Sequence, residues 1–123
     1  DVSAQRLKTA VWLARSSGAV VVLKGDDSLV TDGDRVAIND MPSPGLATAG
    51  TGDVLAGICG TFLGHGLDPF AAACAAVRIH TLAGRLAADR IGSAEAVIAS
   101  DVIDSLPAAL AQACANGGSG RVG

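Results

Sequence analysis

The strongest chemical signal in the chain is a run of small residues that ends in one carboxylate. Residues 43–57 read SPGLATAGTGDVLAG, and Gly50, Thr51 and Gly52 lead into Asp53 where an apolar, helix-like pattern begins. If a helix starts near Asp53, its first backbone N–H groups have no partners within the helix and point at a common spot. The aligned peptide dipoles add about half a positive charge there. Such a helix end favours a bound phosphate.

Asp53 is then a candidate base for the reactant that meets this phosphate. A carboxylate that faced the phosphate itself would repel it, so the side chain is useful chiefly when it faces an acceptor hydroxyl. Phosphoryl transfer uses this arrangement, because fixed dipoles stabilise the transferred group while a carboxylate orients and deprotonates the acceptor oxygen. The structural alternative is that Asp53 only caps the helix and the glycines form a tight turn. The loop alone leaves both interpretations open.

A second candidate binding residue is Lys24, which ends an apolar run. Residues 19–23 are continuously apolar and β-branched, which is typical of a strand covered on both faces in a parallel sheet. Ligands of open α/β sheets bind beyond the carboxyl ends of strands. A solvated lysine at a strand end is the commoner explanation of such a residue.

The elements that must position these residues follow from periodicity and turn signals. Apolar residues at helical spacing predict a helix over residues 3–17, and Gly18 stands where a helix commonly ends. Two β-prone runs, 29–31 and 36–38, flank Asp-Gly-Asp at 32–34, which predicts an antiparallel hairpin.

The second half of the chain reads as helices. A helical face extends from the neighbourhood of Asp53 to a break at residues 64–66. Asp68 and Pro69 predict the cap and first turn of a helix over residues 70–89. Further along, Ser100 and Asp101 are predicted to cap a helix through Leu106, and Pro107 begins a turn toward Ala115. We expect Gly57, Gly60 and Gly84 to let helices approach closely, and the Gly-rich tail 116–123 to be disordered.

Composition bounds the class of protein. The 123 residues fit one small domain, half of them are hydrophobic and 2% are aromatic, so the core must be built from Ala, Val, Leu and Ile. A net charge of -3 argues against nucleic acid as the main partner. No apolar run approaches the roughly 20 residues that span a bilayer, and residues 1–6 do not resemble a signal peptide. We therefore expect a soluble cytoplasmic protein.

Cysteine and histidine give no sign of a metal site. Cys59, Cys74 and Cys114 are odd in number and far apart, so we expect them to be buried, reduced and inert. His65 and His80 have no partner at metal-ligand spacing. Because His80 lies in an Ala-rich helical pattern, we interpret it as a packed core histidine.

Four segments, taken together, resemble a known family. They are VVVLKGDDS at 20–28, ATAGTGDVLAG at 47–57, RIHTLAG at 78–84 and ASDVIDSLPAAL at 99–110. Over about residues 1–110 the chain resembles the C-terminal part of ADP/ATP-dependent NAD(P)H-hydrate dehydratases, the YjeF C-terminal family of the ribokinase-like superfamily. The resemblance implies an α/β, partly ribokinase-like fold with a short parallel strand, a β-hairpin and packed helices. Residues 1–115 would be the C-terminal part of that domain.

The resemblance also implies an activity. Members of this family repair NADHX and NADPHX, the hydrated forms of the reduced nicotinamide cofactors. A nucleotide phosphorylates the hydroxyl on the hydrated ring, and elimination of the phosphate regenerates NADH or NADPH. Bacterial members generally use ADP and eukaryotic ones ATP, with Mg2+ as the companion ion.

Transferred residue by residue, the resemblance assigns roles to the positions singled out above. Asp53 becomes the catalytic group that meets the hydroxyl of the hydrate. Asn39 and the turn Ser43-Pro44-Gly45 are candidates for substrate contact, with loop shaping an equally good explanation, and Ala49 stands where the family frequently has glycine. The nucleotide-binding positions are Lys24, Gly25, Asp26, Asp27, Ser28, Gly50, Thr51 and Gly52.

The first half of the family's domain has no counterpart in these residues. We therefore expect association with the missing N-terminal half or self-association, because a free sheet edge and uncovered apolar faces favour it. The isolated chain could be inactive for the same reason. Two other functions stay open: a ribokinase-like kinase of a small molecule such as a vitamin precursor, and a non-catalytic nucleotide-binding fragment.

Overall fold

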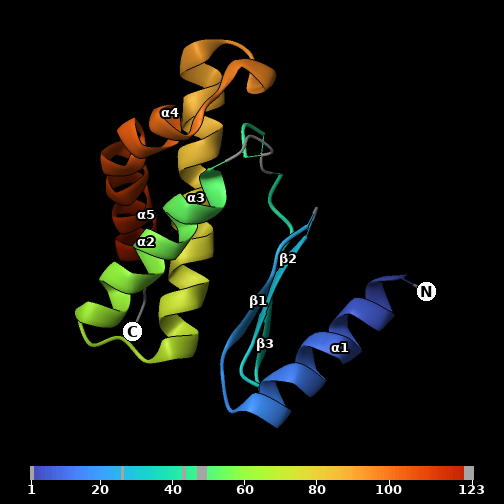
Figure 1. The fold of residues 1–123 in the computed structure, drawn as a ribbon. Coiled ribbons are helices and arrows are strands. Elements are labelled where there is room, and N and C mark those ends of the chain that lie inside the picture. The colour runs from blue at the N-terminus through green and yellow to red at the C-terminus, as the bar shows by residue number, and fades with distance from the viewer. Residues whose placement is uncertain (1, 26, 43, 47–49, 121–123) are drawn as a thin grey trace. The chain divides into compact units, whose positions relative to one another are not determined.

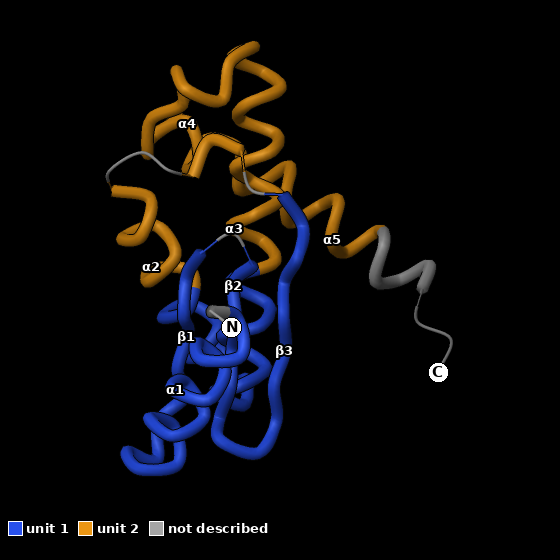
Figure 2. The backbone as a smooth tube through the Cα atoms, turned by 90° about the vertical axis from the view of Figure 1, so that its right-hand side faces the viewer, with its two compact units in different colours: residues 1–42, 59–77 blue, residues 43–58, 78–123 orange. Residues whose placement is uncertain are grey.

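The computed structural model describes residues 2–25, 27–42, 44–46 and 50–120, with backbone only at residue 2 and residues 116–120. The chain forms two compact units, which Figure 2 distinguishes by colour: residues 1–42 with 59–77, and residues 43–58 with 78–123. Two long helices, residues 51–64 and 69–91, each contribute residues to both units. The composition had suggested one small domain.

The first unit contains a three-stranded sheet with a helix against it. Helix α1 (Val2–Ser17) leads into β1 (Val21–Leu23), β2 (Ser28–Thr31) and β3 (Val36–Asn39). The strand order is β1-β2-β3, and α1 packs along β1 and β2 (Figure 1). Gly18 follows the helix at φ +74, in the left-handed conformation expected for a helix stop.

The sheet is antiparallel throughout the described strands, which corrects the expectation of a parallel strand at residues 19–23. Val21 pairs with Thr31 and Leu23 with Leu29 in antiparallel register. Only residues 24–27 connect β1 to β2, whereas a parallel crossover needs about a dozen residues or more. The residues of β1 are half-buried, not covered on both faces.

The predicted hairpin between β2 and β3 is confirmed, and its turn is closed by side chains. Asp32 Oδ1 accepts hydrogen bonds from the backbone N–H groups of Asp34 and Arg35 at 2.9 and 2.7 Å. Gly33 has φ +102, and its carbonyl accepts a 2.8 Å hydrogen bond from Arg15 Nε of α1. Arg35 pairs with Asp32 and Asp68 and covers the ring of Phe70. The turn is therefore held by polar contacts among its own residues and by contacts from Arg15 of α1 and from Asp68.

The helices that follow are α2 (Thr51–Gly64), α3 (Pro69–Ile91), the short 3-10 turn η1 (Ala94–Ala96), α4 (Ala99–Asp104) and α5 (Leu106–Gly120). Asp68 caps α3 as predicted, because its Oδ2 accepts the backbone N–H of Ala71 at 3.1 Å and Pro69 is the first helical residue. Helix α3 extends slightly beyond the predicted residue 89.

Helix α4 begins earlier than predicted. Its N-cap is Ile98, and Asp101 lies in the first turn, where its carboxylate accepts the Ile98 N–H at 2.9 Å. The helix ends at Asp104, not Leu106, and Leu106 begins α5, with Pro107 in the first turn. Helix α5 continues to Gly120 and so includes residues 116–120 of the tail for which the sequence predicted disorder. Residues 121–123 lie outside the described residues.

The core has the predicted composition. Its buried hydrophobic residues are Ala, Val, Leu and Ile, and Trp12 is 65% exposed. Cys59 and Cys74 are half-buried, and burial raises the pKa of both thiols. Cys114, expected to be buried, is exposed. In the described part of the chain no helix is long and apolar enough to cross a membrane.

Candidate functional site

The glycine-rich loop enters α2 through Gly50. Gly50 has φ +93, and its carbonyl accepts the backbone N–H groups of Asp53 and Val54 at 3.1 and 3.3 Å. The helix starts at Thr51, two residues before the predicted position, so Asp53 lies in its first turn and does not take the N-cap position. The Asp53 side chain is exposed to solvent at this positive end of the helix. The arrangement leaves its carboxylate accessible to a hydroxyl.

Buried polar contacts fix the first residue of α2. Thr51 is 2% exposed, and its Oγ1 donates a 2.8 Å hydrogen bond to the Leu46 carbonyl. His80 of α3 is 4% exposed, and its Nε2 lies 2.8 Å from the Thr51 carbonyl oxygen. Because a carbonyl only accepts, the imidazole is the donor. His80 is therefore a packed core histidine, as predicted, that also supports the start of α2.

Glycines allow close contacts among three of the four family-like segments and the residues that precede them within the second unit. A Cβ on Gly84 of α3 would lie 2.6 Å from Leu46 Cγ, so the loop before the motif packs directly on the helix there. Gly45, at φ +85, approaches Val97 and the Gly84 carbonyl. A Cβ on Gly50 would lie 3.2 Å from the Ala99 Cβ. The α2 N-terminus is thus surrounded by residues from α3 and from the start of α4.

The contacts of these glycines test two expectations: that Gly57, Gly60 and Gly84 allow close helix packing, and that the turn at Gly45 shapes the loop. Gly84 makes the predicted close approach, but to a loop, whereas a Cβ on Gly57 or Gly60 would meet nothing within 4 Å. Gly45 is buried, which favours the loop-shaping role. Ser43 and Ala49 lie outside the described residues.

The second group of candidate residues lies in the first unit, at the turn between β1 and β2. Lys24, Gly25 and Asp27 are exposed, Ser28 begins β2, and Asp26 lies outside the described residues. Ser28 pairs across the sheet with Asn39, the last residue of β3. The fold therefore brings Asn39 to the same end of the sheet as the 24–28 loop. Gly50, Thr51, Gly52 and Asp53 belong to the other unit.

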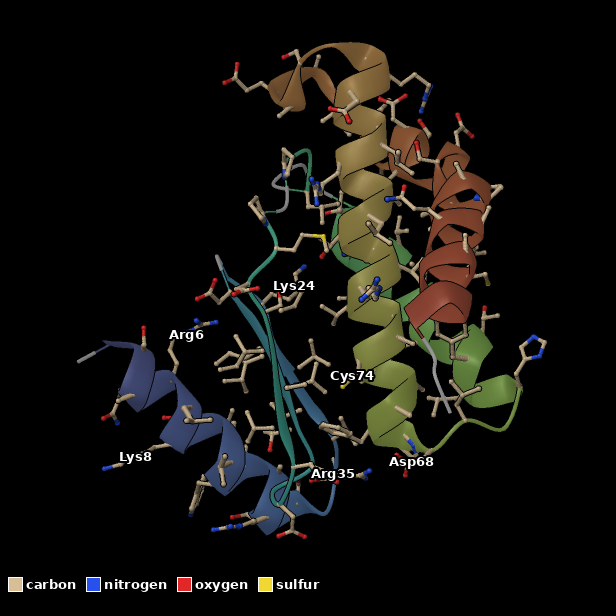
Figure 3. The ribbon with its side chains drawn as sticks, turned by 180° about the vertical axis from the view of Figure 1, so that it is seen from behind. Arg6, Lys8, Lys24, Arg35, Asp68 and Cys74 are labelled. Carbon is tan, nitrogen blue, oxygen red and sulfur yellow. The ribbon has the colours of Figure 1, made fainter. Side chains whose placement is uncertain are left out.

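Arg6 of α1 is a residue that the sequence analysis missed. Its Nη2 donates to the carbonyls of Lys24 and Asp27 at 3.2 and 3.4 Å, and its Nη1 lies 3.4 Å from the Asp27 carbonyl. Figure 3 shows Arg6 directed toward the Lys24 end of the sheet, while Lys8 points away from it. Arg6 shares the i, i+4 stripe of the buried Ala10 and Ala14, and an arginine on that stripe was the available signal.

The charged groups of the candidate site are few. Among the described residues, no group of three or more His, Cys, Asp and Glu side chains is placed to hold a metal ion by itself. Among the described residues of the two candidate segments, the exposed charged side chains are Asp53 in one unit and Lys24 and Asp27 in the other. One unit therefore presents an exposed carboxylate in the first turn of a helix, and the other presents an exposed turn with a lysine.

Comparisons with known proteins agree with this description. A family model described as NAD(P)H-hydrate dehydratase matches residues 1–108. The bifunctional NAD(P)H-hydrate repair enzyme of Hyperthermus butylicus is 40% identical over 110 residues, 89% of this chain and 20% of that protein. The ADP-dependent (S)-NAD(P)H-hydrate dehydratase of Neisseria meningitidis is 38% identical over 103 residues, 83% of this chain and 35% of that protein.

A solved structure extends the match to the fold. The ADP/ATP-dependent NAD(P)H-hydrate dehydratase of Bacillus subtilis, co-crystallised with ATP/Mg2+, superposes with a TM-score of 0.81 at 29% identity. The match covers 90% of this chain and 40% of that structure. The expected ribokinase-like α/β fold, present in part, is thereby confirmed. The chain spans between a fifth and two fifths of the length of these proteins. It belongs to the NAD(P)H-hydrate dehydratase family.

Proposed function

We propose that the whole protein dehydrates NAD(P)H hydrates, NADHX or NADPHX, in a nucleotide-dependent reaction that regenerates NADH or NADPH. The observation that carries this proposal is the family match over residues 1–108, which includes a helix N-terminus with an accessible Asp53. Relatives named for this activity match most of the chain.

In the proposed reaction Asp53 accepts the proton of the hydrate hydroxyl. The hydroxyl oxygen attacks the terminal phosphoryl group of the nucleotide, and the bond from that phosphorus to the nucleotide's bridging oxygen breaks. The developing charge is stabilised by the N–H groups at the start of α2, including that of Gly52. Phosphate then leaves with the electrons of its bond to carbon while the neighbouring ring carbon loses a proton. The ring double bond is restored.

The nucleotide is ADP or ATP, and its binding segment is the loop from Lys24 to Ser28. The lysine ammonium and the exposed backbone of the turn suit a polyphosphate. Mg2+ fits the site as an ion carried by the phosphates, because magnesium is usually held by one or two carboxylates plus substrate phosphates. Asp27 is the exposed carboxylate among the described residues of this loop that could complete its shell.

The test is recovery of reduced-nicotinamide absorbance from NADHX and NADPHX with Mg2+ and either ADP, ATP or no nucleotide. We expect nucleotide-dependent recovery by the full-length protein and its loss by about 10²–10⁴-fold in Asp53→Asn. The matched control is Asp89→Asn, which makes the same change at an exposed carboxylate on a different helix, α3. Stable phosphorylation of an alcohol without NADH release would indicate a small-molecule kinase. Nucleotide binding with no turnover would indicate a non-catalytic protein.

We further infer that the site is completed by the part of the domain that precedes these residues in the relatives. Strand β1 has β2 on one side, and no described strand pairs with its other edge. A strand of the preceding half, or of a second copy, would cover that edge, and exposed apolar residues such as Trp12 offer further apolar surface to a partner. Residues 1–123 alone should therefore associate on size-exclusion chromatography and show little turnover. We place the activity in the cytoplasm, where the reduced cofactors are used.

A further inference from the structure

Arg6 of α1 forms hydrogen bonds with the described residues at both ends of the 24–28 loop. The Arg6 guanidinium reaches the carbonyls of both Lys24 and Asp27, the residues on either side of the turn between β1 and β2. Each carbonyl stands at an end of the turn, so one planar group ties the ends together. A guanidinium suits this task because its donors have a fixed, planar geometry.

A cavity lies beside the contact between Arg6 and the 24–28 loop. It has a volume of about 210 Å³ and is lined by Ser3, Ala4, Arg6, Leu7, Asp27, Leu29 and Ile38. Arg6 and Asp27 both form part of its wall, so side chains do not fill the space beneath the loop at this point. The Arg6 guanidinium therefore links the described ends of the loop to α1 at the edge of an unfilled space.

Gly25 lies directly under the guanidinium. A Cβ at this position would come within 2.7 Å of Arg6 Nη2 and 3.2 Å of Arg6 Cζ. Its φ is not in the left-handed region, so the backbone conformation does not require glycine. The space occupied by Arg6 is the reason that the structure gives for a glycine after Lys24.

We propose that Arg6 is a positioning residue for the nucleotide-binding loop: it holds the Lys24 and Asp27 carbonyls in place so that the turn and the Lys24 ammonium meet the phosphates in one geometry. This inference rests on the proposed function, because it takes the loop to bind ADP or ATP. Arg6 acts through the loop and does not touch the reacting atoms. Gly25, which has no Cβ, leaves the space that the guanidinium occupies.

The experiment compares Arg6→Gln, Arg6→Lys and the control Lys8→Gln, which removes an exposed charge from the same helix. In the full-length protein, amide hydrogen exchange of Gly25, Asp27 and Ser28 is measured without ligand. KM and kcat for ADP and ATP are measured with NADHX and Mg2+. We expect faster exchange and about a tenfold higher nucleotide KM in Arg6→Gln, with kcat nearly unchanged. Lys8→Gln should match the unmodified protein.

The lysine variant separates positioning from simple charge. One ammonium cannot bridge two carbonyls in the fixed geometry of a guanidinium, so Arg6→Lys should behave like Arg6→Gln. Full rescue by Arg6→Lys would overturn the proposal, because the charge alone would then suffice. Unchanged amide exchange in Arg6→Gln would overturn it as well.

Gly25→Ala supplies an independent arm of the test. The added methyl group displaces the far end of a flexible side chain, so it should speed loop exchange as Arg6→Gln does, and the double variant should be no worse than either single variant. Additive effects would contradict this coupling. If the unmodified protein binds neither nucleotide, the proposed function fails, and the exchange measurements alone decide whether Arg6 positions the loop.

Discussion

Two aspartates of this chain show that local contacts, not residue type, decide what a carboxylate can do. Asp32 and Asp53 each stand beside backbone N–H groups. The Asp32 carboxylate is committed to the hairpin turn, where it accepts two backbone N–H groups and pairs with Arg35. Asp53 is exposed in the first turn of α2. The proposed function therefore uses the exposed carboxylate of Asp53 and not that of Asp32.

The Asp32 contacts predict an acid-dependent loss of stability. The hydrogen bonds from the Arg35 and Asp34 backbone and from the Arg35 side chain lower the pKa of Asp32 to about 2, below its usual 3.8. A lowered folded-state pKa stabilises the protein above about pH 4, and the stabilisation is lost as the pH falls toward 2. Urea midpoints of the unmodified protein and Asp32→Asn, measured from pH 5 to 2, should converge at the acid end. A constant difference over this range would contradict the prediction.

The buried His80 imidazole contacts the first residue of α2, the helix end that we propose binds phosphate. The Thr51 carbonyl and the Gly52 N–H belong to one planar peptide unit, so a hydrogen bond that holds the carbonyl also orients the N–H. His80→Ala should cost about 1–3 kcal/mol of stability and speed amide exchange at Gly52 and Asp53.

Comparison with the exposed His65 supplies the control for this prediction. His65→Ala removes an imidazole after the end of α2 and should leave both stability and exchange unchanged. Equal exchange in the two variants would show that the His80 contact does not hold the helix start.

The packing of elements depends on where glycine faces a neighbour. Gly84 and Gly60 both lie in helix interiors, but a Cβ on Gly84 would lie 2.6 Å from Leu46 Cγ, and one on Gly60 would meet nothing within 4 Å. Gly84→Ala should therefore cost about 1–3 kcal/mol through overpacking. Gly60→Ala should gain about 0.5–1 kcal/mol, because alanine is the better helix former. Urea unfolding of the two variants tests this, and opposite signs are the expected result.

For the whole protein, binding and chemistry should separate at Asp53. Nucleotide with Mg2+ at one hundred times its dissociation constant should stabilise the folded protein by about 2.7 kcal/mol and raise its melting temperature. Asp53→Asn should keep this shift while losing turnover, since its carboxylate is assigned to the acceptor hydroxyl. Loss of the thermal shift in Asp53→Asn, with the fold intact, would instead assign the carboxylate to nucleotide binding.

Helix and turn positions were predictable because their signals are local. The Asp68 cap, the Gly18 stop and the turn at residues 32–35 each depend on residues within a few positions of one another. The start of α2 was placed two residues late, since Gly50 closes the first turn through its carbonyl and leaves no side-chain cap to read. The prediction that β1 pairs in parallel was wrong, because an apolar run does not specify the direction of the neighbouring strand.

The sequence by itself determined the family, the core composition and the candidate residues, because these follow from residue types and from the order of the motifs. Tertiary structure alone decided which distant residues support them. Arg6 reaches the 24–28 loop from α1, and His80 reaches the start of α2 from α3. Gly84 admits the loop that carries Leu46. These contacts join residues 18 to 38 positions apart, and a linear pattern carries no record of where packing brings two side chains together.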